Sequence, residues 1–302
     1  MALNSIVNTI FCGKNGYLGT GLANCKFDFD NMSGGGVGLL TVGTDISLAA
    51  SMADFRALQV AGSFLPIQGI FNVEDQGSED QFETSESGLE ALSTKGLFKY
   101  KVDFTNGHMY HKVLASLEGN NRWEVVMWDA AGNLDLRETA TGELRGYSTS
   151  HVTVGKPTNK SGGTTAKQSL IFQLSNRAQK DNQLSYINAD QLETQGISLL
   201  ELEGVNKLEI SLNPVVVGAT EITGTIVSPF DSNLTEPTLV EGDFTFTGIV
   251  PTAATVSDLG VFTITVPAVT LDTVFTASIN GVFENATNQL FKSNIGKVIV
   301  TA

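Results

Sequence analysis

The chain has 302 residues, of which 41% are hydrophobic and 17% are charged, and its formal net charge is −14. This length accommodates one large domain or two ordinary domains that each bury a core. The negative charge excludes a protein that grips nucleic acid through its phosphates, because that task needs clustered Lys and Arg. It does not exclude a surface past which DNA slides without sticking, since like charges repel.

The charged fraction is low, because about a quarter of the residues is typical of a soluble domain. Thr, Ser, Val and Gly take the place of the charged residues. Two interpretations stay open: neighbouring subunits cover much of the surface, or the surface is simply polar and uncharged. The acidic residues are unevenly spread, with eleven acidic against three basic side chains in residues 201–302.

Nothing in the sequence indicates export or a membrane. The first residues lack a positive segment, and Asn4 and Asn8 interrupt their apolar run. No stretch reaches the ~20 apolar residues that span a bilayer. We therefore expect a chain that is made in a host cytoplasm and has no membrane partner. Cys12 and Cys25 match no metal motif, and they are either free thiols or one disulfide.

Two segments have helical periodicity. In residues 51–61, apolar residues repeat at three-residue spacing and Gly62 follows. In residues 106–119, Asn106 can cap a helix, an apolar stripe follows at 3.6-residue spacing, and Gly119 ends it. Each predicted helix is short and is expected to pack one face on a sheet.

The remaining sequence up to residue 203 alternates in the manner of strands. Strands are predicted for residues 68–73, 97–104, 122–128, 133–137, 145–154 and 166–174. Turn-forming residues 129–132 predict a hairpin between the third and fourth of these strands. Residues 156–165 are predicted to be a flexible polar tip between the two long strands. This order predicts an α+β domain of residues 1–203 that is dominated by antiparallel sheet.

After residue 203 the helical periodicity vanishes and short strands follow one another. They are predicted for residues 208–212, 221–226, 243–249, 261–266, 274–279 and 297–301. Six or seven strands in about a hundred residues are typical of an immunoglobulin-like β-sandwich. The sequence therefore predicts a second domain of residues 204–302 and a mainly β protein.

The motifs that carry catalysis or cofactor binding are absent from the sequence. There is no nucleophile elbow, no phosphate-binding P-loop and no dinucleotide fingerprint. His108 and His111 have a spacing that can place two imidazoles beside a metal, but no third ligand completes the set. Asp129, Asn133 and Asp135 could ligate an ion across a turn, although Asx residues also favour turns for their own sake. We expect no enzyme activity, no cofactor and no metal.

An acidic segment is the strongest local charge feature. Its carboxylates are Glu74, Asp75, Glu79, Asp80, Glu83 and Glu86. Three interpretations stay open: a solvated loop, a contact between subunits, or a metal or catalytic site. Trp123 and Trp128 lie at odd separation in one predicted strand and so face opposite sides. One of them can be core, and the other, Trp128, is a candidate for a partner surface.

The order of elements in residues 1–203 resembles the tail-tube fold of tailed bacteriophages. In that family, a β-sandwich with a flanking helix forms rings, and long loops reach other subunits. The resemblance implies that residues 106–117 are the flanking helix and that residues 74–87 and 156–165 are arms between subunits. The C-terminal domain resembles the immunoglobulin-like domains that decorate many virion proteins. Candidate subunit contacts are then Glu74, Asp75, Glu79, Asp80, Glu83, Lys156, Lys160 and Trp128.

The first hypothesis is thus a structural virion protein, a tail-tube or neck-ring subunit. Its partners would be copies of itself, with hexameric rings as one option, and other virion proteins. DNA would pass only as non-specific, repelled cargo. The alternatives are a capsid decoration or head-fibre protein, and an adhesin module that binds glycans or a cell surface.

Overall fold

The structure is a computed structural model, and it describes residues 2–3, 32–84, 86, 89–106, 108–159, 165–228, 235–285 and 289–302, with only the backbone at residues 108 and 109. Cys12, Cys25 and Lys160 lie outside the described residues. The chain divides into two compact units, Met1–Glu203 and Gly204–Ala302. The division falls where helical periodicity ends in the sequence. The fold is mainly β, as the sequence predicts.

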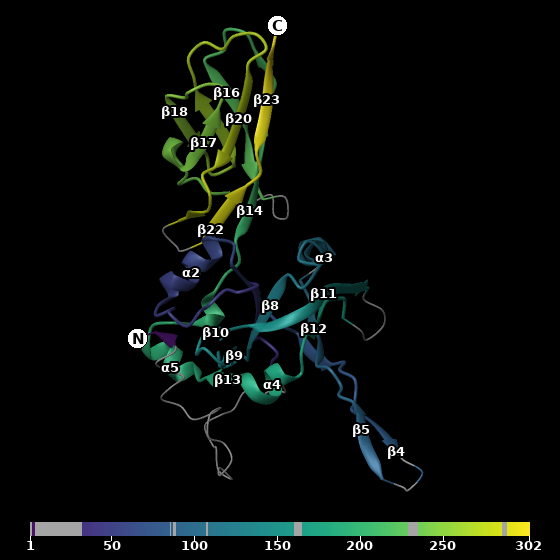
Figure 1. Cartoon of the computed structure of the whole chain (residues 1–302). Coiled ribbons are helices and arrows are strands. Elements are labelled where there is room, and N and C mark those ends of the chain that lie inside the picture. Colours follow the sequence, from purple (N-terminus) through teal and green to yellow (C-terminus); the bar gives the residue numbers. More distant parts are fainter. Residues whose placement is uncertain are drawn as a thin grey trace. The chain divides into compact units, whose positions relative to one another are not determined.

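The N-terminal unit contains one continuous sheet and short helices (Figure 1). Its strands are β1 (Gly36–Thr41), β2 (Phe64–Gln68), β3 (Asn72–Asp75), β6 (Lys99–Phe104), β7 (Gly119–Asn120), β8 (Trp123–Trp128), β9 (Leu134–Glu138), β10 (Leu144–Arg145), β11 (Tyr147–Thr158), β12 (Lys167–Leu174) and β13 (Leu184–Ile187). A separate two-stranded sheet is formed by β4 (Gln81–Thr84) and β5 (Glu90–Thr94). The helices are α2 (Met52–Val60), α3 (His108–Ala115), α4 (Ala178–Gln183), α5 (Ala189–Thr194) and the 3₁₀ turn η3 (Leu199–Glu201).

Strand β11 joins two halves of the large sheet. Its start, Tyr147–Ser148, pairs with β8, and its later residues pair with β12. The β8 half also contains β1, β2, β9, β10 and β13, and the β12 half contains β6, β3 and β7. Every pairing among the described strands of this unit is antiparallel.

The β8 half is buried on both faces. One face packs with the β12 half and α3 around a cluster that includes Val125, Phe172 and Leu114. The other face packs against α2, α5 and the segment that follows α5. All six residues of β8 are consequently buried. A strand covered on both sides has no solvent face, so five of the six residues of β8 are apolar, and the sixth, Glu124, is buried in an ion pair with Arg137.

Two predicted elements differ from the structure. Residues 68–73, predicted as one strand, contain the end of β2, a turn, and the start of β3. Gly69 in that turn has φ of 75°, a left-handed conformation that glycine adopts without steric cost. The sequence also predicts only two helices, whereas α4 and α5 are additional ones. Each has six residues, which is too short to display a clear 3.6-residue period.

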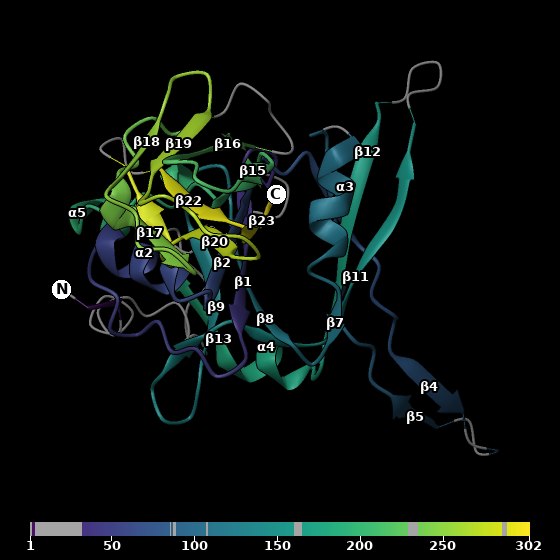
Figure 2. The same cartoon turned by 90° about the horizontal axis from the view of Figure 1, so that it is seen from above.

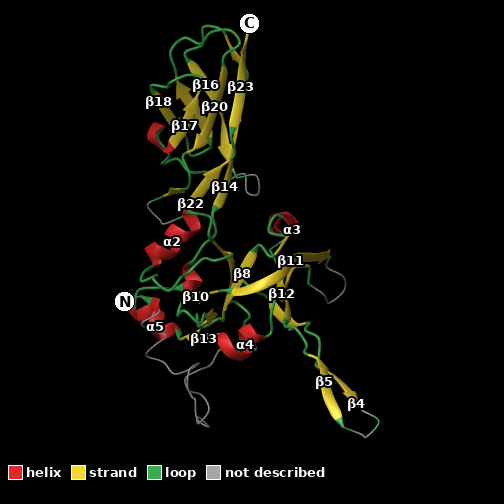
Figure 3. Ribbon diagram, in the orientation of Figure 1, coloured by secondary structure: helices red, strands yellow, loops and turns green. Residues whose placement is uncertain are grey.

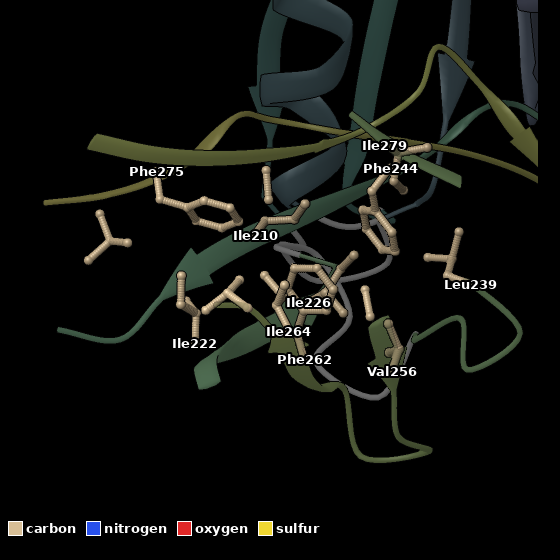
Figure 4. Close-up of a cluster of buried hydrophobic side chains, with 14 of the residues drawn as sticks. Ile210, Ile222, Ile226, Leu239, Phe244, Val256, Phe262, Ile264, Phe275 and Ile279 are labelled. Carbon is tan, nitrogen blue, oxygen red and sulfur yellow. The ribbon is translucent and has the colours of Figure 1, made fainter. Parts of the chain in front are cut away.

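The C-terminal unit has two sheets around one core (Figure 4). The first contains β18 (Ala253–Val256), β19 (Val261–Thr265), β16 (Glu221–Val227), β14 (Asn206–Leu212), β22 (Leu290–Ser293) and β21 (Phe283–Glu284). The second contains β15 (Val215–Val216), β23 (Gly296–Thr301), β20 (Val274–Ile279) and β17 (Phe244–Thr247), which follows the 3₁₀ turn η4 (Glu241–Asp243).

Side chains from both sheets fill this core. Phe262 of β19 stacks on Phe244 of β17 with ring centroids 4.8 Å apart. Ile210, Ile264 and Phe275 are also buried in the same cluster. Buried residues alternate with exposed or half-buried ones along β16 and β23, which is the pattern of a sheet with one face toward solvent.

Candidate assembly surface

The hairpin β4–β5 projects from the N-terminal unit (Figure 3). Every residue of its two strands is exposed. Phe82 and Leu92 are directly opposite each other in the register, so both side chains lie on one face. Phe82 is 60% exposed and Leu92 is 44% exposed. We call residues 79–94 the arm, and the arm presents an apolar pair that no described part of its own chain covers.

Two glycines shape the stem from which the arm leaves the sheet. A Cβ on Gly96 would lie 1.7 Å from the carbonyl oxygen of Ser78, and one on Gly77 would lie 2.8 Å from that of Leu97. The two chain segments therefore cross at backbone contact, which only glycine permits. The amide of Leu97 also donates to the Ser78 hydroxyl.

Asp80 fixes the stem electrostatically. Its Oδ1 accepts from the amide of Gly96 at 2.8 Å, and it forms an ion pair with Arg177, the residue before α4. The hydrogen bond from Gly96, with help from Arg177, lowers the pKa of the Asp80 carboxyl. Arg177 also lies over the ring of Phe98 at the start of β6. The base of the arm is thus tied to the body of the unit.

The predicted acidic contacts divide into three groups. Glu74 lies in β3 and pairs with Lys101 at 3.0 Å, and Asp75 caps the turn by accepting from the amide of Gly77. Asp80 belongs to the stem. Glu79 and Glu83 are exposed on the arm, together with Glu86 and Glu90 beyond them. The structure therefore places only the later carboxylates on the projecting hairpin.

The long hairpin β11–β12 carries the predicted basic contact. Lys156 is exposed near the loop end of β11. Helix α3 contacts both β11 and β12, and exposes Lys112. Neither lysine forms an ion pair with any described residue.

The prediction that Trp128 contacts a partner is wrong. Its side chain is 0% exposed and belongs to the core beneath α2 and α5, and Trp123 is buried in the other core. The indole Nε1 of Trp128 donates to Gln68 at 3.2 Å. Odd separation does place the two rings on opposite faces, but both faces of β8 are covered within the unit.

A polar network inside the N-terminal unit superficially resembles a catalytic site. Asp135 accepts from the Tyr147 hydroxyl at 2.7 Å and pairs with Lys180, which also lies 4.4 Å from the Tyr147 ring centroid. Burial raises the pKa of the Asp135 carboxyl, which Lys180 and Tyr147 oppose, and burial also raises the pKa of Tyr147. Asp135 and Tyr147 are sealed from solvent, so the network ties β9, β11 and α4 together and offers no surface for a substrate.

The other predicted ligand positions also serve the fold. Asp129 accepts from the amides of Ala131 and Asn133 and from the Asn133 side chain, which is a closed Asx turn. The side chain of His108 lies outside the described part, and His111 is half-buried. Among the described residues, no group of three or more His, Cys, Asp or Glu side chains is placed to hold a metal ion.

Sequence reasoning missed the apolar pair Phe82–Leu92. The acidic residues around Phe82 obscure the strand-like alternation in the segments Gln81–Thr84 and Glu90–Thr94. Alternation on either side of a serine- and glycine-containing stretch is a hairpin signal, and it could have identified the arm.

No protein-family model, curated protein or solved structure matches this chain. In the part of the chain that the structure describes, no helix has both the length and the apolar character needed to cross a bilayer.

Proposed function

We propose that this chain is a structural virion protein of a tailed bacteriophage that assembles with copies of itself into rings, as a tail-tube or neck-ring subunit. In this proposal, residues 1–203 are the tail-tube-like assembly domain and residues 204–302 are an immunoglobulin-like domain. The protein has no catalytic role, and it resides in the virion. The arm is the single observation that carries the proposal.

An isolated two-stranded hairpin is marginally stable in water. The arm buries none of its strand residues within its own chain, yet its stem is fixed by Asp80, Arg177 and the glycines at 77 and 96. Apolar side chains that a monomer exposes to water on a fixed projection become favourable when another molecule buries them. This favours a subunit whose arm is covered by another molecule.

The edges of the large sheet support the same function. Among the described strands, β2 pairs with β1 alone, and β3 pairs with β6 alone. Such edges invite pairing with another chain unless they are protected. Pro66 protects β2 in part, because proline has no amide to donate, but β3 has no proline. In a tail-tube-like ring, sheets of neighbouring subunits would join at edges of this kind.

A variant that lacks the arm tests the proposal. Residues 81–94 are replaced by a short Gly-Ser linker, and the purified chains are compared by negative-stain electron microscopy and light scattering. The wild-type chain should form rings or stacked rings, whereas the variant should stay monomeric with an unchanged circular dichroism spectrum. The matched control shortens the exposed turn at residues 139–142, and it should assemble normally. A wild-type chain that stays monomeric at every concentration contradicts the proposal.

An adhesin is the second candidate, and one observation favours it. Val250 and Leu259 are exposed by more than four-fifths in loops of the C-terminal unit, as apolar loop residues of a binding module can be. A monomer that binds glycans on an array would support this alternative over the ring subunit. A decoration or head-fibre protein is distinguished by binding to preformed capsids instead of to itself.

A further inference from the structure

The arm and the hairpin β11–β12 carry opposite charges. Residues 79–94 contain five acidic residues and no basic one, and Asp80 among them is already paired with Arg177. Residues 147–174, which are β11, β12 and the residues between them, contain three lysines, Lys156, Lys160 and Lys167, and no acidic residue.

The two hairpins leave the sheet at opposite ends. The arm adjoins the start of β6, where Lys99 pairs with Gln173 of β12. The loop of β11–β12 adjoins the other end of β6, where Phe104 pairs with Gln168. About 17 Å of strand separates these ends at the usual rise per residue. Figure 2 shows the arm and the far ends of β11 and β12 extending in opposite directions. An arm therefore cannot neutralise the basic hairpin of its own chain in this conformation.

We propose that the arm of one copy docks on the basic face formed by α3 and the loop end of β11 in a second copy. The apolar pair Phe82–Leu92 supplies the buried area, and Glu83 and Glu90 of the arm meet Lys112 and Lys156 of the second copy. This inference rests on the proposed self-assembly and deepens it by naming the two surfaces that meet.

The charges of the arm are available for such a contact. Glu90 is exposed and forms no ion pair with any described residue, and Glu83 accepts a hydrogen bond from the Ser93 hydroxyl at 3.0 Å. On the receiving face, Lys112 and Lys156 are both exposed. Glu118, the carboxylate next to α3, already accepts from the amide of Val154 at 2.8 Å. Lys167 forms an ion pair with Asp103 of its own chain, so the proposed contact does not include it.

The pairing also bears on the type of assembly. Two different surfaces at opposite ends of one sheet can meet head to tail, so that each copy gives its arm to one neighbour and receives an arm from another, which is the heterologous arrangement that the proposed ring requires. Such contacts generate rings when the rotation closes, and filaments when it does not. A contact of arm with arm is not expected, because like charges would then face each other, and a closed dimer in which two copies exchange arms reciprocally would contradict the ring. The pairing thus explains how a chain of strongly negative net charge can associate with itself.

Charge reversal in the full-length chain tests the pairing. Variant A carries Glu83→Lys and Glu90→Lys, and variant B carries Lys112→Glu and Lys156→Glu. Each alone should raise the concentration at which assembly is half complete by about tenfold or more, because like charges then face each other. An equimolar mixture should assemble at the wild-type concentration, since each arm finds a receiving face of opposite sign. The control carries Glu209→Lys and Glu221→Lys on exposed positions of the C-terminal unit, with the same change in net charge as variant A, and should not weaken assembly.

The possible outcomes separate this inference from the function on which it rests. If the wild-type chain assembles and variants A and B assemble equally well, the pairing is wrong while self-assembly stands. The same conclusion follows if A and B each fail to assemble and their mixture also fails. A wild-type chain that never assembles contradicts both. Unchanged circular dichroism and thermal unfolding of A and B establish that the substitutions, all on exposed side chains, leave the fold intact.

Discussion

Gly36 has no side chain, and this leaves space for the indole ring of Trp128. These residues are cross-strand partners in β1 and β8. A Cβ on Gly36 would lie 2.3 Å from the Trp128 ring, and one on Gly38 would lie 2.4 Å from the ring of Phe64. The glycines therefore let the indole and the phenyl ring lie flat on β1 and complete the core beneath α2.

We predict that Gly36→Ala destabilises the N-terminal unit by about 1–3 kcal/mol, the usual effect of overpacking a well-filled core. The added methyl group must displace the Trp128 ring, which has close neighbours on every side. Denaturant unfolding measures the change. Gly242→Ala is the control, because a Cβ there meets nothing within 4 Å, and it should have an effect below about 0.5 kcal/mol. Equal effects of the two substitutions would show that the ring has room to move.

The network around Asp135 gives a prediction that depends on pH. Lys180→Met leaves the Asp135 carboxylate buried without its cation, and we expect a loss of about 3–5 kcal/mol at neutral pH. Burial raises the pKa of Asp135 in the folded state, so the folded state holds the proton more tightly than the unfolded state. The stabilising effect of that proton is present below the unfolded pKa, about 4, and is lost as the pH rises through the folded pKa. The destabilisation caused by Lys180→Met should therefore be smaller near pH 4 than at neutral pH.

Unfolding of the Lys180→Met variant and of the wild type is compared at each pH. Lys207→Met removes an exposed lysine of the C-terminal unit and serves as the control for lost charge. A loss that is equal at pH 4 and pH 7 would mean that Asp135 does not take up the proton when Lys180 is absent.

Sequence reasoning reached some of these residues and not others. The Asx turn at Asp129 was one of two open alternatives, and the hydrogen bonds at that turn decide between them. The burial of Trp128 was not foreseeable from β8 alone. Alternation within a strand says which side chains share a face, but it does not say that a second layer covers the other face.

At the scale of elements, the stem of the arm is the feature whose strength varies with pH. The hydrogen bond from Gly96 lowers the pKa of Asp80, and Arg177 contributes in the same direction. A carboxyl with a lowered folded pKa stabilises the folded form above its unfolded pKa, and this stabilisation is lost as the pH falls through the folded pKa. We therefore predict that acidification loosens the stem before it affects the sheet.

Hydrogen exchange of the Gly96 and Leu97 amides measures this effect. Protection should fall in acid relative to the amide of Val102 in β6, after correction for the intrinsic rate. In the Asp80→Asn variant, protection should be low already at neutral pH and should change little with acid. Full protection in the variant would show that the glycine crossing alone holds the stem.

Elements with a clear hydrophobic period were the most predictable. Helix α2 lies within the predicted residues 51–61, with Gly62 shortly after its end, and β20 has the predicted bounds. Two-residue strands such as β15 and β21, and a helix of fewer than two turns such as α5, carry too little periodicity to be predicted. The parallel pairing of β14 with β22 joins residues about eighty positions apart, and no local pattern signals it.

At the scale of the whole molecule, each core belongs to one unit. The cluster around Phe262 and Phe275 contains only residues after Gly204, and the clusters around Trp123 and Trp128 contain only residues before it. The sequence predicted this organisation because alternation without helices begins near residue 203. The proposed function was less accessible, since it would depend on surfaces such as the arm and on molecules outside the chain.

Separate cores lead to a prediction about unfolding. Ile264→Ala, in the buried face of β19, should lower the stability of the C-terminal unit by about 2–5 kcal/mol, and Phe172→Ala, in β12, should lower that of the N-terminal unit by about 3–5 kcal/mol. Because neither side chain belongs to the core of the other unit, each substitution should move one of two calorimetric transitions and leave the other in place. Thr265→Ala, on the exposed face of β19, is the control and should move neither. A single transition that both core substitutions shift equally would mean that the two units unfold as one cooperative body.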